Sequence, residues 1–167
     1  MLIVNGTLVT FGARNRIIHD GALRIQDDLI SDVSTTSDLR SKYPGEEELD
    51  ARGKLVMPGL ICAHTHFYGL FARGMSLRQE PPADFRQILE RLWWRLDKAL
   101  TLDDIRYSAL VCLIDAIRNG TTTLFDHHAS PHAIEYSLDI IAEAVTQAGL
   151  RCCLCYEVSD RDGPEAT

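Results

Sequence analysis

Two histidines one residue apart end a short apolar run in the stretch LVMPGLICAHTHFYG, residues 55–69. If Leu60 to Ala63 form a strand, residues two apart share a face, so His64 and His66 project together while Thr65 points away. Imidazole is a common nitrogen ligand for zinc and iron, and two imidazoles on one face can bind a single ion. The spacing therefore indicates a metal site; the alternative is a pair of hydrogen-bonded polar residues at a strand end.

A second polar group ends the β-prone run TTTLFDHH, residues 121–128. Alternation along a strand places Asp126 and His128 on one face and His127 on the other. Taken alone, these residues would lead into a helix that has Ser130 as its N-cap and Pro131 at its first helical position.

The elements that must position these residues alternate between strand and helix after residue 57. Strands are predicted around residues 60–63, 122–125 and 152–156, and helices around residues 85–96, 101–119 and 130–149. Alternating strands and helices imply a parallel sheet of right-handed βαβ units. Each strand starts apolar and ends polar, which is typical of α/β folds whose chemistry lies at the carboxyl ends of the strands.

The first 57 residues lack long helical periodicity and are rich in β-prone runs. Asn5-Gly6 and Asp20-Gly21 have the composition of hairpin turns between such runs. Residues 37–54 are polar and predict a short helix followed by a loop.

Composition narrows the class of partner. The chain of 167 residues is 46% hydrophobic and 25% charged, as expected of a globular protein with a sizeable core. A net charge of −7 and a pI near 5.3 argue against nucleic acid or an anionic membrane as partner. There is no signal-peptide pattern and no apolar run near the ~18 residues of a membrane span. We therefore expect a cytoplasmic protein that acts on a small-molecule substrate.

The five cysteines are an odd number without the spacing of a disulfide framework. Cys152 and Cys155 form a C-x-x-C, but residues three apart on a strand face opposite ways and cannot chelate one metal. We expect buried core thiols.

The stretch PGLICAHTH closely resembles the first barrel strand of the amidohydrolase superfamily, and the β-rich segment before it resembles that superfamily's accessory β-sandwich. GLFARGM and LTLDDIRYSALVCLIDAIRNGTTTLFDHHASPH resemble the deaminase and chlorohydrolase branch. FDHHASPH and YEVSDRDG are similar to the SsnA group of aminohydrolases. The resemblance covers essentially all 167 residues.

The resemblance implies an α/β fold in two parts. Residues 1–57 would form the β-sandwich accessory segment, and residues 58–167 the first three strand-helix units of a TIM-like (β/α)8 barrel. A complete barrel typically needs about 250 residues. We therefore expect an N-terminal fragment of a larger enzyme, inactive by itself.

The resemblance also assigns site residues. His64 and His66 match the first two metal ligands, and the implied cofactor is a divalent metal, Zn²⁺ first with Fe²⁺ as the alternative. In the family the other ligands and a proton-shuttling glutamate come from later strands, so catalytic residues are expected downstream of Thr167. Asp126, His127 and His128 are expected to line the substrate pocket.

The implied activity is hydrolytic deamination or dechlorination of a nitrogen heterocycle or related amidine by metal-bound hydroxide. The bond broken would be a carbon-nitrogen bond other than a peptide bond, and the full-length protein could form a homo-oligomer. Two alternatives stay open: a cyclic-amide hydrolase of the hydantoinase type, and a non-catalytic module that binds a metal or a partner protein. The stretch GTTTLFDHH favours the deaminase branch over the hydantoinases.

Overall fold

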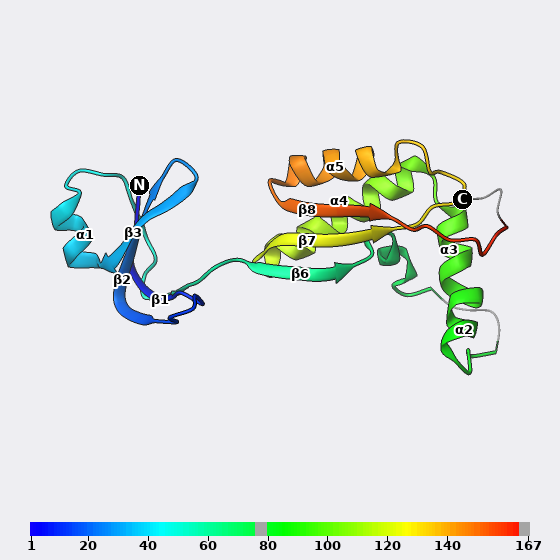
Figure 1. The fold of residues 1–167 in the computed structure, drawn as a ribbon, viewed down its shortest axis with the longest axis horizontal. Coiled ribbons are helices and arrows are strands. Elements are labelled where there is room, and N and C mark those ends of the chain that lie inside the picture. The colour runs from blue at the N-terminus through cyan, green and yellow to red at the C-terminus, as the bar shows by residue number, and fades with distance from the viewer. Residues whose placement is uncertain (76–79, 164–167) are drawn as a thin grey trace. The chain divides into compact units, whose positions relative to one another are not determined.

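The computed structural model describes residues 1–75 and 80–163 (Figure 1). The chain divides into two compact units, Met1–Pro58 and Gly59–Thr167. None of the helices in the described ranges combines the length and the apolar character that a membrane crossing requires.

The described first unit is built on one mixed sheet of five strands. Its elements are β1 (Leu2–Val9), β2 (Ile17–Gln26), β3 (Leu29–Thr35), α1 (Thr36–Lys42), β4 (Glu48–Asp50) and β5 (Leu55–Val56). β2 pairs antiparallel with β1 and β3, whereas β4 and β5 pair parallel to β1. Leu2, Val4, Ala22 and Leu39 form its buried core. The segment for which a β-sandwich was expected is thus a single sheet with one helix in the described residues.

The two expected hairpin turns of this unit were wrong. Asn5-Gly6 and Asp20-Gly21 lie inside β1 and β2, where Gly6 pairs with Gly21 across irregularities in the register. Asn5 and Asp20 have positive φ angles of 56° and 47°, but the glycines that follow do not continue that conformation, as a type I′ turn would require. The strands therefore bulge instead of reversing.

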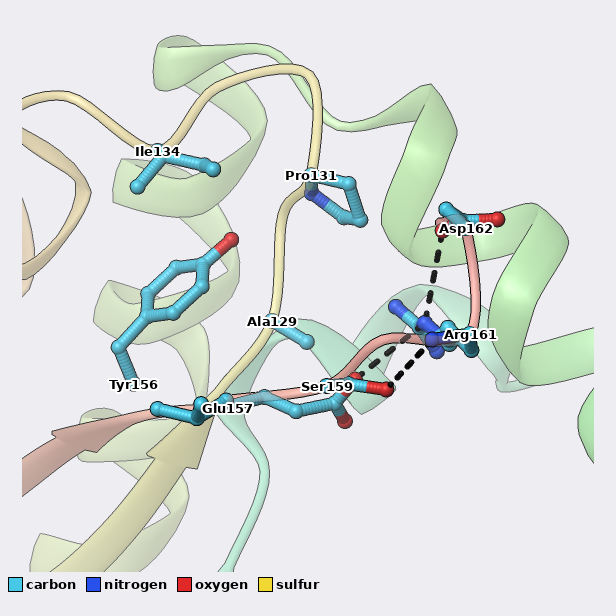
Figure 2. Close-up of a pocket in the computed structure, with 9 residues that line it drawn as sticks. Ala129, Pro131, Ile134, Tyr156, Glu157, Ser159, Arg161 and Asp162 are labelled. Atoms are coloured by element: carbon cyan, nitrogen blue, oxygen red, sulfur yellow. Dashed lines mark hydrogen bonds and ion pairs between the residues drawn. The ribbon is translucent and has the colours of Figure 1, made fainter. Parts of the chain in front are cut away.

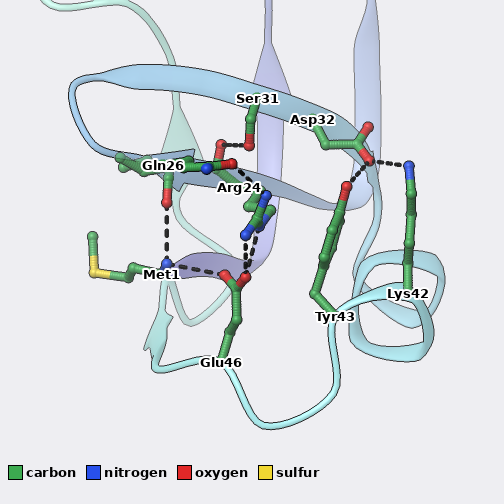
Figure 3. Close-up of polar contacts among 9 residues, drawn as sticks. Met1, Arg24, Gln26, Ser31, Asp32, Lys42, Tyr43 and Glu46 are labelled. Atoms are coloured by element: carbon green, nitrogen blue, oxygen red, sulfur yellow. Dashed lines mark hydrogen bonds and ion pairs between the residues drawn. The ribbon is translucent and has the colours of Figure 1, made fainter.

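A network of polar contacts connects β2, β3 and the chain that follows α1 (Figure 3). Glu46 accepts hydrogen bonds from the N-terminal amine of Met1 at 3.0 Å and from Arg24 Nε at 2.7 Å. The Arg24 guanidinium lies 4.2 Å from the centre of the Tyr43 ring, and the Tyr43 hydroxyl donates to Asp32 at 3.0 Å. These contacts are peripheral to the sheet, and they fix the end of α1 against it.

The second unit contains the predicted parallel sheet, in the order β6-β7-β8. Its strands are β6 (Leu60–Thr65), β7 (Thr121–His128) and β8 (Arg151–Tyr156), which confirms the predicted positions and direction. Its helices are α2 (Phe85–Ile88), α3 (Trp94–Ala99), α4 (Leu102–Arg118) and α5 (Ser137–Ala148), with a 3-10 helix at Phe67–Ala72 and a π-helical segment at Leu89–Trp93.

The helices α4 and α5 pack on one face of this sheet. Leu113 of α4, Leu124 of β7 and Ile141 of α5 share one buried core. On the other face, Ile61 and Phe125 are exposed. The sheet therefore presents one packed face and one open face, and the carboxyl ends of its strands lie at one common edge.

The two predicted helix starts had different outcomes. Thr101 and Asp104 form a reciprocal capping box at the start of α4, as expected. The predicted cap at Ser130 was wrong, because α5 starts seven residues later, at Ser137. The Ser130 hydroxyl instead donates to the Ala133 carbonyl at 2.9 Å, which closes a turn. Tyr136, with a φ of 65°, then delays the helix.

Candidate active site

His64, near the end of β6, and His66, directly after it, meet at their ring nitrogens. His64 Nε2 and His66 Nε2 lie 2.9 Å apart, and the two ring planes are inclined by 81°. The β6–β7 register is irregular between Cys62 and Thr65, so the end of β6 departs from a regular strand here. The i, i+2 spacing thus brings both nitrogens to one point.

The backbone of β7 fixes the orientation of the His66 ring. His66 Nδ1 lies 2.8 Å from the carbonyl oxygen of His127. Because a carbonyl can only accept, Nδ1 carries a proton, and in the neutral imidazole it is then Nε2 that has the lone pair. This is the tautomer that binds a metal through Nε2, held by the kind of second-shell hydrogen bond common at metal sites.

The donor chemistry of this pair fits a divalent ion such as zinc or iron. A catalytic zinc site normally uses three protein ligands and an open position. The described ranges contain no group of three or more His, Cys, Asp or Glu side chains that could hold a metal. His64 and His66 therefore fit such an ion as two members of a larger ligand set.

Asp126 lies behind the histidine pair, in the interior of the unit. Its side chain is 1% exposed, and Oδ1 accepts a hydrogen bond of 2.8 Å from the backbone N–H of Phe67. Burial raises the pKa of this carboxyl to about 7, against the lowering effect of the Phe67 bond. Oδ2 is buried without a hydrogen-bond partner in the described parts of the chain.

His128 is also buried, on the same face of β7 as Asp126. Its Nε2 lies 2.9 Å from Ser130 Oγ, whose proton is donated to Ala133, so His128 is the donor. Burial lowers the pKa of His128 to about 4. Its ring makes edge contacts with Tyr68 and Tyr156, each at 5.8 Å between ring centres.

His127 differs from its two neighbours, because it lies on the side of the histidine pair. Its ring centre is 5.4 Å from that of His66, and it borders the same cavities as His64 and His66. The alternation expected for residues 126–128 is therefore seen in their burial. A role for any of the three in substrate binding stays a prediction, and the geometry favours His127 for it.

Two cavities share the histidine pair. One, of about 410 Å³, lies on the open face of the strands and is bordered by Phe125, Cys153 and Cys155. The other, of about 360 Å³, extends toward the helices. Its walls include Tyr68, Phe85, Leu89, Trp93 and Trp94.

A buried ion pair, Asp97 with Arg161, also lines the aromatic cavity. Arg161 donates to Asp97 at 2.7 Å, and the side chains are 10% and 1% exposed respectively. The Arg161 guanidinium also lies 5.5 Å from the Trp94 ring centre and 3.3 Å from a Glu157 oxygen. Burial raises the pKa of Asp97, and Arg161 acts against that effect.

Sequence reasoning missed this pair, because Asp97 and Arg161 are 64 residues apart. The available signal was an acidic residue one helical turn after Trp93, next to the apolar stripe of the predicted helix. The nearby Tyr68 has its pKa raised to about 12, chiefly by burial and then by Asp97.

The expectation of buried core thiols was wrong, because none of the five cysteines is fully buried: Cys62, Cys112 and Cys152 are half-buried at the edge of the core. Cys153 and Cys155 are exposed and border the cavity on the open face of the sheet. Cys152 instead packs against the helices, so Cys152 and Cys155 do face opposite ways, as the strand geometry predicted.

A smaller cavity of about 150 Å³ lies between the segments that follow β7 and β8 (Figure 2). Tyr156 forms one wall, and its hydroxyl accepts a 2.9 Å hydrogen bond from the Ser130 backbone. Arg161 and Asp162 lie on the opposite side. Arg161 thus borders both this cavity and the aromatic cavity.

The family model described as "Amidohydrolase family" matches residues 55–166. The chain belongs to the amidohydrolase family. The matched range contains both histidines, β7 with its polar end, and β8.

The relatives of this amidohydrolase chain include deaminases. It is 30% identical over 162 residues to 5-methylthioadenosine/S-adenosylhomocysteine deaminase of Acetivibrio thermocellus, covering 93% of this chain and 33% of that protein. The enzyme of the same name from Haloarcula marismortui is 40% identical over 110 residues, covering 66% and 23%. The chain thus spans about a third of the length of such relatives or less.

Solved structures support the same branch. A variant of atrazine chlorohydrolase TrzN from Arthrobacter aurescens TC1, complexed with zinc and atraton, is 28% identical, with a TM-score of 0.77 over 92% of this chain and 35% of that one. Escherichia coli guanine deaminase superposes with a TM-score of 0.79 at 21% identity, covering 99% and 39%. The latter likeness shows the fold alone. The described fold therefore matches the N-terminal part of amidohydrolase structures.

Proposed function

We propose that this chain is the N-terminal portion of a metal-dependent aminohydrolase, which deaminates or dechlorinates a nitrogen heterocycle by hydrolysis. One observation carries the proposal. In a chain of the amidohydrolase family, the Nε2 atoms of His64 and His66 converge to 2.9 Å, and the His127 carbonyl fixes the metal-binding tautomer of His66.

The metal that these histidines suit best is zinc, as in the TrzN complex, and iron(II) has similar ligand preferences. Bound here, such an ion would supply a Lewis acid that activates water for attack on carbon. The chain's own residues have three further roles. His64 and His66 would bind the ion, the His127 carbonyl orients the His66 ring, and the aromatic cavity would receive the substrate.

The substrate proposed is a planar nitrogen heterocycle. Tyr68 and Trp93 are in edge contact at 6.3 Å between ring centres and line the aromatic cavity beside the histidines. Such walls favour flat, apolar-faced ligands. The names of the relatives, a deaminase of adenosine derivatives and a chlorohydrolase of atrazine, support this class.

Finer assignments belong to the same proposal. Membership of the SsnA group rests on FDHHASPH and YEVSDRDG. We also propose a cytoplasmic location, no nucleic-acid or membrane partner, and homo-oligomer formation by the intact protein.

The proposal is tested with the intact protein, freed of metal and reconstituted with Zn²⁺ or Fe²⁺. Adenosine derivatives, guanine and chlorotriazines are tested for release of ammonia or chloride, and hydantoin serves as the substrate of the alternative class. Metal-dependent turnover of a heterocycle, abolished in His66→Ala, is the expected result. Turnover of hydantoin alone, or no turnover with either metal, would overturn the proposal.

A further inference from the structure

We propose that Asp126 is a positioning residue, whose carboxylate anchors the backbone directly after His66 and thereby fixes that imidazole for metal binding. The inference deepens the proposed function and rests on it. It also departs from the expectation that Asp126 contacts substrate: Asp126 borders the open-face cavity, but its side chain is only 1% exposed and its Oδ1 is occupied by the Phe67 N–H.

The anchor lies where the sheet hydrogen bonding ends. Thr65, the last residue of β6, is opposite Asp126 in the β6–β7 register. The chain then leaves the sheet through His66 and enters the 3-10 helix at Phe67. A buried N–H at this exit has no strand partner and would lose a hydrogen bond. Asp126 Oδ1 accepts from it at 2.8 Å.

His66 is thereby held from two directions by the same strand. The His127 carbonyl binds the imidazole at Nδ1, at 2.8 Å, and the Asp126 side chain holds the next peptide. On the other side of that peptide, the Phe67 ring is fully buried in the core. No side chain caps the 3-10 helix at His66 in its own turn, so the Asp126 bond supplies the polar contact that fixes this exit.

The consequence is a fixed position for one ligand of the proposed ion. Residues that orient metal ligands typically contribute about 10- to 100-fold in metal affinity. Loss of the Asp126 acceptor should free the peptide after His66 and let the imidazole move. Zinc affinity should therefore depend on an acceptor at position 126, although this residue does not touch the ion.

The test compares zinc affinity of the intact protein by competition with a chromophoric chelator. Asp126→Ala removes the acceptor, and Asp126→Asn keeps Oδ1. Leu124→Ala is the matched control, because Leu124 is buried on the same face of β7 and its loss weakens packing without touching the exit of β6. We expect zinc affinity to fall about 10- to 100-fold in Asp126→Ala, and to stay near wild type in Asp126→Asn and Leu124→Ala.

Wild-type zinc affinity in Asp126→Ala would overturn the inference, as would equal weakening in Asp126→Ala and Leu124→Ala. If Asp126→Ala does not fold, hydrogen exchange of the wild-type protein with and without zinc tests the inference instead. By thermodynamic linkage, if the Asp126–Phe67 hydrogen bond strengthens zinc binding, then bound zinc must stabilise that hydrogen bond by the same factor. Zinc should therefore slow hydrogen exchange of the Phe67 amide about 10- to 100-fold, and unchanged exchange would contradict the anchor. These readouts need no substrate, so failure of the proposed reaction remains a separate result.

Discussion

His66 and His127 are joined by a hydrogen bond from a ring nitrogen to a main-chain oxygen, at 2.8 Å. Because the acceptor belongs to the backbone, the bond survives a change of the His127 side chain. We predict that His127→Ala of the intact protein keeps its zinc affinity but loses about 2- to 10-fold in kcat/KM, the value of one hydrogen bond to substrate. Parallel zinc titration and kinetics check this. Loss of zinc with an unchanged KM would show that the side chain serves the metal instead.

The aromatic wall should matter for binding. Trp93→Ala is expected to raise KM about 2- to 10-fold, as loss of one aromatic contact does, with kcat less affected. Trp93→Phe keeps a flat apolar surface and should behave more like wild type. Steady-state kinetics of both variants decide the point, and an unchanged KM in Trp93→Ala would place the substrate in the open-face cavity.

The Asp97–Arg161 pair should be important for stability. Arg161→Met removes the cation that pairs with the buried Asp97 carboxylate. Breaking a buried pair in this way typically lowers the free energy of unfolding by about 3–5 kcal/mol. Arg106→Met is the control, because its pair with Glu143 is exposed and separated by 3.6 Å, and such pairs contribute about 0–1 kcal/mol. Urea unfolding measures both. Adding Asp97→Asn to Arg161→Met should recover part of the loss.

Asp126 and His128 predict opposite pH dependences of the free energy of unfolding in the metal-free protein. The pKa of His128 is lowered from 6.5 to about 4 in the folded protein. Between pH 6.5 and pH 4 the unfolded chain therefore binds more protons than the folded one, and the free energy of unfolding decreases as the pH falls. The pKa of Asp126 is raised to about 7. The folded protein therefore holds that proton while the unfolded chain releases it near 4, and stability falls as pH rises from 4 to 7. Each effect reaches at most about 3–4 kcal/mol.

Single variants separate the two effects. In Asp126→Asn the remaining histidine should make stability rise between pH 4 and 6.5. In His128→Gln the remaining carboxyl should make it fall over the same range. Urea unfolding at several pH values measures the slopes, and equal slopes in both variants would mean that neither group titrates as described.

The sequence predicted the second unit better than the first, for a physical reason. The strands β6, β7 and β8 are short β-prone runs alternating with helical periodicity, and the α4 cap is a local interaction between Thr101 and Asp104. By contrast, Asn5-Gly6 and Asp20-Gly21 have turn composition, yet sheet pairing of the two glycines keeps both strands continuous. Local preference was overridden by long-range pairing.

The candidate site shows the same division. The i, i+2 spacing predicted that His64 and His66 meet, and they do so although the register is irregular at the end of β6. Ser130 could not be distinguished from a helix cap, since its partners are the His128 ring and the Ala133 carbonyl. The Asp97–Arg161 pair depends on the packing of segments that are distant in the sequence, and the hydrophobic periodicity of a single segment does not predict such packing.

The metal content of the intact protein tests the central claim most directly. Three proteins are purified under the same conditions: wild type, the double variant His64→Ala/His66→Ala and the control His132→Ala. The zinc and iron content per chain is measured by inductively coupled plasma mass spectrometry. His132 lies in the turn after β7, away from the histidine pair. Tightly bound metal in wild type and His132→Ala, lost in the double variant, is the predicted result. Wild-type metal content in the double variant would contradict the account.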